Sequence, residues 1–206
     1  MKIVMRDIKL GIDEAEKAQK EYDDVKNYLS KQKYTSFYEE RKRISKLFCS
    51  MKLSKPIEEV FEAFLDISIE DINPNINKED FEEGQWYRSS KKNNNNLFRL
   101  ETLQKNKEIS LSWVAKKQLF IKSVKFKKNS SNTKTKLTYF DYVKGDTSIQ
   151  GFFERHILNT YIKKQVLAFR IQIFKTSIKL NLVKEKDIPK VNKKIAKLSE
   201  YIKTMI

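Results

Sequence analysis

The chain has 206 residues, of which 39% are hydrophobic and 34% charged, and it contains four glycines and three prolines. This balance predicts a folded globular domain with extensions and excludes a disordered chain, while so few glycines exclude Gly-rich phosphate-binding loops. The formal net charge is +16, and because residues 1–40 hold 8 Lys or Arg and 9 Asp or Glu, the whole basic excess lies in residues 41–206.

That basic excess has two interpretations. A positive field attracts polyanions such as nucleic acid or an anionic membrane surface. Alternatively, lysine is only the solubilising residue of a chain rich in Lys, Asn and Ile, since Lys far outnumbers Arg and Arg is the better phosphate ligand. Composition alone leaves both open.

Cysteine usage and hydropathy point to a cytoplasmic protein. The single cysteine, Cys49, cannot form an intramolecular disulfide, which fits a reducing compartment. Met1–Leu10 contains no apolar run, and no window approaches 18 consecutive apolar residues. We therefore expect neither a signal peptide nor a transmembrane segment.

The first predicted element is an acidic amphipathic helix over Ile12–Leu29. Its apolar residues recur at spacings of three and four, which forms a heptad seam. Tyr34–Glu40 is expected to be a short aromatic connector or a continuation of this helix. Residues 1–42 are thus predicted to form an N-terminal helical extension.

A strand and a helix follow. Arg43–Leu53 alternates between apolar and polar residues, as a half-buried strand does. Ser54 can cap the next helix, and Pro56 suits its first turn because no backbone donor is needed there. That helix is expected to continue to about Ile72, before Asn73-Pro74-Asn75.

A run of strands comes next, bounded by turn-forming residues. The predicted strands are Gln85–Ser90, Leu97–Gln104, Glu108–Ala115, Gln118–Phe126 and Lys134–Val143. Asn93–Asn96 is the expected turn after the first of them. In Lys134–Val143 both sets of alternating residues are apolar or aromatic, which predicts a central strand of the sheet.

Two helices are expected to end the chain. The stretch from Ser148 to about Thr176 is apolar around most of its circumference, so it should be buried on more than one side. Residues 179–206 are expected to hold a basic amphipathic helix, beginning at Asp187, with a second heptad seam. Since the two terminal helices carry opposite charge, we expect them to pair, either within one chain or as a homodimer.

The opening of the body resembles that of START-like, helix-grip proteins. The resemblance is carried by the strand Lys46–Leu53, the Ser54-Lys55-Pro56 step and the helix Ile57–Leu65. The order of elements from Arg43 to Lys175 also matches that superfamily, in particular its small uncharacterised Gram-positive bacterial members.

This resemblance implies an α+β fold in which a curved antiparallel sheet grips a long C-terminal helix. The helix-grip domain would span residues 43–178, with added N- and C-terminal amphipathic helices. The superfamily includes lipid-binding and hydrophobic-ligand-binding proteins, cyclases and co-chaperones, so the resemblance implies a cavity but selects no single function.

The leading functional expectation is non-catalytic binding of an apolar small molecule, a lipid or a partner protein in that cavity. Asp141 lies in the same alternation as Leu137 and Tyr139, so it is either a polar anchor inside the cavity or a structural carboxylate paired with Lys or solvent. The candidate ligand-binding residues are Leu111, Trp113, Phe140, Asp141, Phe153, Ile157 and Tyr161.

The alternative function is nucleic-acid binding by a lysine-rich face. Lysines interleave with aromatic residues over Trp113–Lys128, and such strands can hold single strands by stacking and charge. The candidate residues are Lys116, Lys117, Lys122, Lys125, Lys127 and Lys128. The competing interpretation is a solvated lysine face over an aromatic core.

No residue constellation indicates an enzyme, a metal site or a cofactor. His156 is the only histidine, and one His with one Cys is short of zinc ligands. Asp and Glu cluster mainly where they suit a helix N-terminus or a solvated turn, without EF-hand spacing. We therefore expect no catalytic residues and no bound cofactor.

Overall fold

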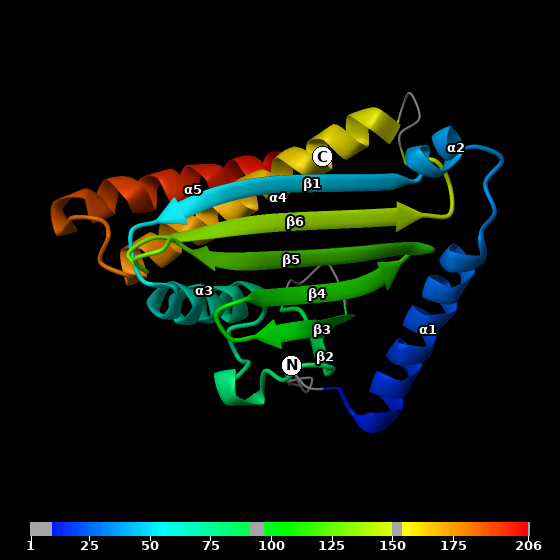
Figure 1. The fold of residues 1–206 in the computed structure, drawn as a ribbon, viewed down its shortest axis with the longest axis horizontal. Helices are drawn as coiled ribbons and strands as arrows, with labels where there is room; N and C mark the ends of the chain where they lie inside the picture. The colour runs from blue at the N-terminus through cyan, green and yellow to red at the C-terminus, as the bar shows by residue number, and fades with distance from the viewer. Residues whose placement is uncertain (1–9, 91–96, 150–153, 206) are drawn as a thin grey trace, which may run out of the picture.

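The computed structural model describes residues 10–90, 97–149 and 154–205 (Figure 1). The predicted turn at Asn93–Asn96 lies outside the described residues. The helices are α1 (Ile12–Lys31), α2 (Phe37–Lys42), α3 (Ile57–Ile72), α4 (Glu154–Lys179) and α5 (Ile188–Thr204), with short 3-10 helices at Lys78–Asp80 and Glu185–Asp187. The strands are β1 (Ile44–Leu53), β2 (Trp86–Arg88), β3 (Leu97–Gln104), β4 (Glu108–Ala115), β5 (Gln118–Lys128) and β6 (Thr135–Gly145).

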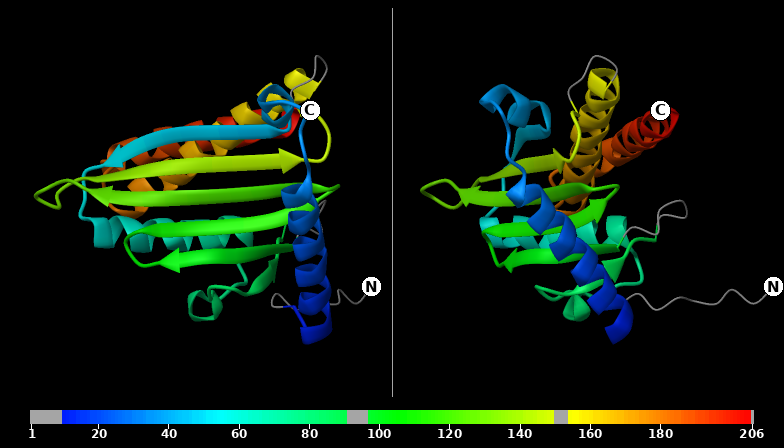
Figure 2. Two further views of the ribbon diagram at one scale, coloured as in Figure 1. Left: turned by 45° about the vertical axis from the view of Figure 1, so that its right-hand side comes forward. Right: turned by 90° about the vertical axis from the view of Figure 1, so that its right-hand side faces the viewer.

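The expected α+β class is confirmed. Six strands form one open, curved, antiparallel sheet in the order β1-β6-β5-β4-β3-β2. Helices α3, α4 and α5 lie on one side of this sheet, and α1 crosses the other side near one end (Figure 2). We call the side that faces α4 the inner face and the opposite side the outer face.

Most predicted boundaries agree with the structure within a few residues, because hydrophobic period and turn residues agree locally. The long helix begins at Glu154 rather than Ser148, among described residues, and ends at Lys179. The connector before β1 contains a separate helix, α2, whose N-terminus is capped when Ser36 Oγ accepts a hydrogen bond from the backbone N–H of Glu39 at 3.3 Å.

Strand alternation divides the sheet residues between the two faces. In β6, Leu137, Tyr139 and Asp141 point to the inner face, and the residues between them point outward. Because β6 pairs with β1 on one side and β5 on the other, the prediction that this strand is central is confirmed.

The main core fills the space between the inner face, α3 and α4. Aromatic rings dominate it, and Phe64 lies 5.6 Å from Phe126 and 6.3 Å from Phe169 between ring centroids. A smaller core lies on the outer face under α1, where Tyr22 packs edge-on against Trp86 at 5.9 Å. Each face of the sheet therefore has its own apolar cluster.

The two terminal helices do not pair within the chain. Helix α1 packs on β4 and β5 at the outer face, whereas α5 turns back along α4 on the inner side (Figures 1 and 2). The expected intrachain pairing is wrong because each heptad seam finds a partner in the body: the sheet for α1 and α4 for α5. Pairing between two chains stays a prediction.

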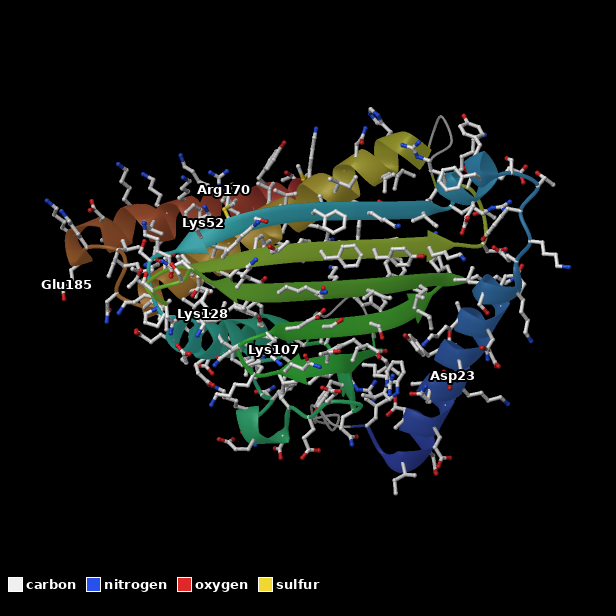
Figure 3. The ribbon with its side chains drawn as sticks, viewed as in Figure 1. Asp23, Lys52, Lys107, Lys128, Arg170 and Glu185 are labelled. Carbon is white, nitrogen blue, oxygen red and sulfur yellow. The ribbon has the colours of Figure 1, made fainter. Side chains whose placement is uncertain are left out.

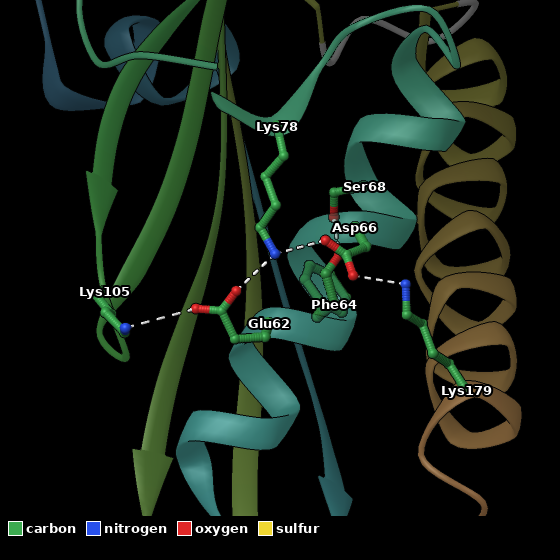
Figure 4. A network of polar contacts seen from close by, with 7 residues as sticks. All are labelled: Glu62, Phe64, Asp66, Ser68, Lys78, Lys105 and Lys179. Carbon is green, nitrogen blue, oxygen red and sulfur yellow. Dashed lines mark hydrogen bonds and ion pairs between the residues drawn. The ribbon is translucent and has the colours of Figure 1, made fainter. Parts of the chain in front are cut away.

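A network of ion pairs ties α3 to the 3-10 helix Lys78–Asp80, which precedes β2, and to the end of α4 (Figure 4). Asp66 accepts hydrogen bonds from Lys78 at 2.7 Å and from Lys179 at 2.6 Å, and Lys78 also donates to Glu62 at 2.6 Å. Burial alone would raise the pKa of Asp66, but the hydrogen bonds from Lys179 and Lys78 outweigh it and lower this pKa.

We predict that Asp66→Asn lowers the free energy of unfolding by about 1 kcal/mol at neutral pH, since each partly exposed pair contributes little alone. A carboxylate whose pKa is lowered by folding stabilises above its unfolded-state pKa. The difference between wild type and variant should therefore shrink as pH falls below about 4. Urea unfolding over a pH series measures it.

The matched control is Asp24→Asn on the exposed side of α1, which should change the free energy of unfolding by less than about 0.5 kcal/mol. If Asp66→Asn has the same free energy of unfolding as this control at neutral pH, the ion pairs between α3 and α4 do not contribute to stability.

Candidate functional site

A cavity of about 1190 Å³ lies between the inner face of the sheet, α3, α4 and the end of α5. Small-molecule sites typically occupy about 300–1,000 Å³. The space that the sequence led us to expect between the sheet and the long helix is therefore present, and the core does not fill it.

The sheet supplies an aromatic wall of the cavity. Trp113 and Phe120 are register partners on β4 and β5, and their rings stack in parallel with centroids 5.1 Å apart. Leu111 continues this wall along β4. All three side chains remain partly exposed although they point inward, so the wall is apolar surface that the protein itself does not cover.

One side of α4 forms the opposite wall. Tyr161, Gln165, Phe169 and Gln172 recur at helical spacing and line the cavity. Ile157, one turn before Tyr161, also lines it and is 71% exposed, which places this residue at the mouth of the cavity. The closing edge comes from α5, whose Ser199, Ile202 and Lys203 reach the same space.

A polar cluster bridges the sheet and α4 at this cavity. We define the Asp141 cluster as Lys122, Tyr139, Asp141, Tyr161 and Gln165. Tyr139 donates a hydrogen bond to Asp141 at 2.8 Å, and Tyr161 donates to both carboxylate oxygens at 3.0 and 3.1 Å. Lys122 donates to Gln165 at 2.6 Å, and its Nζ lies 4.0 Å from Asp141.

Burial sets the electrostatics of the cluster. Asp141 is 3% exposed, and this burial raises the pKa of its carboxyl group, although Lys122 and the two tyrosine hydroxyls partly offset the effect. Burial and the nearby carboxylate also raise the pKa values of Tyr139 and Tyr161 well above the usual tyrosine range. Both phenols therefore stay protonated and act as donors.

Four of the seven predicted ligand-binding residues line the cavity, namely Leu111, Trp113, Ile157 and Tyr161. Asp141 lies immediately behind the lining, held by Tyr139 and Tyr161, so it is both inward-pointing and paired. Phe153 lies outside the described residues.

Phe140 must be corrected, because it points to the outer face. It neighbours Asp141 in β6, and successive residues of a strand point to opposite faces. Its ring packs instead against Phe48 of β1, with centroids 4.9 Å apart. The alternation alone could have excluded it, since Asp141 and Phe140 cannot share a face.

The six lysines predicted for nucleic acid do not form one face, which is a second correction. Lys122 points into the cavity, and Lys116 lines it from the β4–β5 turn. Lys117 lies over the ring of Tyr28 in α1, at 5.8 Å from its centroid. Of the others, Lys125 and Lys127 point outward, while Lys128 is exposed at the end of β5.

Sequence reasoning missed three members of the Asp141 cluster as site residues. Lys122 was assigned to the basic face, whereas Tyr139 and Gln165 were not singled out. The strand register explains why Lys122 belongs to the cluster, since Lys122 of β5 is the cross-strand partner of Asp141. The alternation in β6 predicts that Tyr139 points to the same face as Asp141. Gln165 could not be predicted in this way, because the side of α4 that faces the sheet does not follow from the sequence of a helix that is apolar all round.

Cys49 and His156 are the other two candidate reactive groups among the described residues. Burial raises the pKa of the Cys49 thiol, which disfavours a reactive thiolate. His156 is exposed on α4. Within the described ranges, no group of three or more His, Cys, Asp and Glu side chains could hold a metal ion, and no helix has the length and hydropathy needed to cross a membrane.

Comparisons with solved structures find similar architectures at low identity. MLL2253 from Mesorhizobium loti is 13% identical, with 68% of this chain and 98% of that chain covered and a TM-score of 0.49. SA2116 from Staphylococcus aureus, a protein of unknown function, is 16% identical, with 65% and 92% covered and a TM-score of 0.46.

An HSP90 activator from Plasmodium falciparum, PFC0360w, is 17% identical, with 47% of this chain and 71% of that chain covered and a TM-score of 0.36. No protein-family model and no curated protein matches the sequence. At these identities the comparisons assign no family, and the functional argument depends on the chemistry of the site.

We predict that the free energy of unfolding of the wild type falls, relative to that of Asp141→Asn, as pH rises above about 4. Its pKa is raised by folding, so the folded state holds the proton more tightly, and its contribution is present at low pH and lost through the folded-state pKa. Urea unfolding of both proteins across this range measures the difference. A difference that instead grows in favour of wild type with pH would mean that the ionised carboxylate is the form the cluster stabilises.

Proposed function

We propose that the protein binds an elongated apolar molecule carrying one polar end, held in the cavity between the sheet and α4 without chemical change. The observation that carries this proposal is the position of the partly exposed aromatic wall beside the buried Asp141 cluster. Apolar lining with a few convergent polar groups is the usual composition of small-molecule sites.

The apolar part of the ligand would lie along Leu111, Trp113 and Phe120. These side chains stay partly exposed inside the cavity, and covering apolar surface contributes about 25 cal/mol per Å². The parallel rings of Trp113 and Phe120 offer a flat edge to a chain or a fused ring system. Binding would therefore complete a core that the protein leaves open.

The polar end would lie at the Asp141 cluster. Lys122 and Tyr161 reach the cavity lining from opposite walls, one from β5 and the other from α4. A buried polar network of this kind rejects a purely apolar end, since that end would leave hydrogen-bonding groups without water or ligand. This favours an alcohol or acid over an alkane.

The chain's place in the START-like superfamily is part of the same proposal. The order of strand, Pro-preceded helix, sheet and long helix supports it, as does the position of the cavity. We also retain a non-catalytic role and a cytoplasmic location as proposals, the latter resting on the single cysteine.

Filling the cavity tests the proposal. Ala168 of α4 lines the cavity, so Ala168→Trp places a large ring where the ligand would lie. We expect Nile red to bind the wild type and to be displaced by dodecanol or dodecanoate, and its affinity to drop about tenfold or more in the variant. Fluorescence titration measures both.

The matched control is Ala196→Trp, because Ala196 is exposed on α5 and is not part of the cavity lining. This variant should bind Nile red as the wild type does. Equal binding by all three proteins, with unchanged thermal unfolding, would place the apolar probe elsewhere and contradict the proposal. Displacement by dodecane as effective as that by dodecanol would contradict the role of the polar cluster.

A further inference from the structure

The outer face of β1, β6 and β5 is a second surface with its own chemistry. Helix α1 covers only one end of it, where Leu119 and Ile121 pack against that helix. The rest faces the viewer in Figure 1, and Figure 3 shows aromatic rings over β1 and β6 in the same view. This uncovered area takes no part in the cavity, which lies on the other side of the sheet.

Three aromatic rings form a row on this area. Phe48 and Phe140 are register partners with centroids 4.9 Å apart, and Tyr142 lies two residues along β6, with its ring 6.3 Å from Phe140. Phe48 is 65% exposed. Phe140 and Tyr142 are half-buried beside it, so the row presents one exposed and two half-buried rings, and apolar surface gathered in this way on a sheet indicates a surface used for contact.

Lysines surround the rings. The outward positions of the three strands hold no Asp or Glu, and the lysines there are Lys46, Lys52, Lys125, Lys127, Lys136 and Lys144. We call these lysines, together with Phe48, Phe140 and Tyr142, the aromatic–lysine face. Nearby acidic groups are Glu108 of β4, whose carboxylate lies 3.5 Å from Lys125, and Glu40 of α2 near Tyr142.

The positive charge of this face favours an anionic partner. The aromatic rings then distinguish between two anionic partners, a membrane surface and a nucleic acid. A membrane surface is typically bound by an amphipathic helix with a continuous apolar face, whereas the rings here form a single row on a sheet, set among Ser50 and Thr138. Rings on an open sheet, flanked by cations, instead match the way proteins stack the bases of single strands while lysines meet the phosphates.

We propose that the aromatic–lysine face binds single-stranded nucleic acid without sequence preference. Bases would stack on Phe48, Phe140 and Tyr142, and the backbone would run past the lysines. This places the nucleic-acid site on the outer face of β1, β6 and β5, which shares only Lys125 and Lys127 with the six lysines that the sequence suggested. The site does not depend on the cavity, so both ligands could be bound by one molecule.

Fluorescence anisotropy with labelled oligo(dT) and oligo(U) of about 12 nucleotides tests the proposal. We expect binding at low salt that weakens steeply as salt rises, with a slope of about −0.7 per phosphate contacted. A duplex of equal length should bind more weakly, because its bases cannot reach the rings.

Two variants separate stacking from charge. Phe48→Ala with Phe140→Ala should weaken binding to single strands about tenfold and leave the salt slope unchanged. Replacing Lys52, Lys127 and Lys136 by Ala should reduce that slope by about 2. The matched controls are Tyr201→Ala and the replacement of Lys190, Lys193 and Lys197 by Ala, all exposed on α5 across the molecule.

Each outcome of these binding measurements either supports or overturns the proposal. Loss of affinity in the face variants with the controls unchanged supports the proposal. Equal loss in the α5 lysine variant would mean that net charge alone binds the oligonucleotide, which overturns it. Binding to vesicles containing phosphatidylserine, with no binding to oligonucleotides at low salt, would overturn it in favour of a membrane partner. Circular dichroism of each variant confirms that the fold is retained.

Discussion

The contact between the sheet and α4 at the cavity centres on one buried carboxylate. Asp141 points from the sheet toward α4, where an isolated charge would cost several kcal/mol, so it must be hydrogen-bonded. Tyr161 of α4 and Tyr139 of β6 donate to it from two elements. The Tyr161 bonds join α4 to the sheet beside the cavity, whose aromatic wall at Trp113 and Phe120 stays partly exposed.

Strand alternation then gives the molecule two independent surfaces. In β6 the inward residues serve the core and the cluster, while the residues between them build an aromatic and basic exterior. Helix α1 covers the exterior at one end only, and α5 lies on α4 rather than on α1. An apolar ligand on one side and a polyanion on the other would thus meet different residues of the same strand. The net charge of +16 has a physical role in this account, as the outward positions of β1, β6 and β5 hold six lysines and no Asp or Glu, although Glu108 of β4 pairs with Lys125.

Much of the fold follows from the sequence, since the strands from Leu97 onward and the helix after Pro56 carry a clear period and clear turn residues. The cavity wall at Leu111 and Trp113 follows from the same alternation. The expectation that Phe140 lines the cavity is wrong because aromatic character does not decide which face of the strand a residue takes, whereas its position next to Asp141 does. Lys122 and the pairing of α5 with α4 depend on cross-strand register and helix packing, which join residues far apart in sequence and leave no local pattern.

Native mass spectrometry of the protein purified from its own host, at low and at high salt, tests the central claim most directly. The account predicts a small apolar molecule bound one to one that survives high salt, and its loss from Ala168→Trp. A mass equal to that of the bare chain under both conditions, with the same result for the variant, would contradict it.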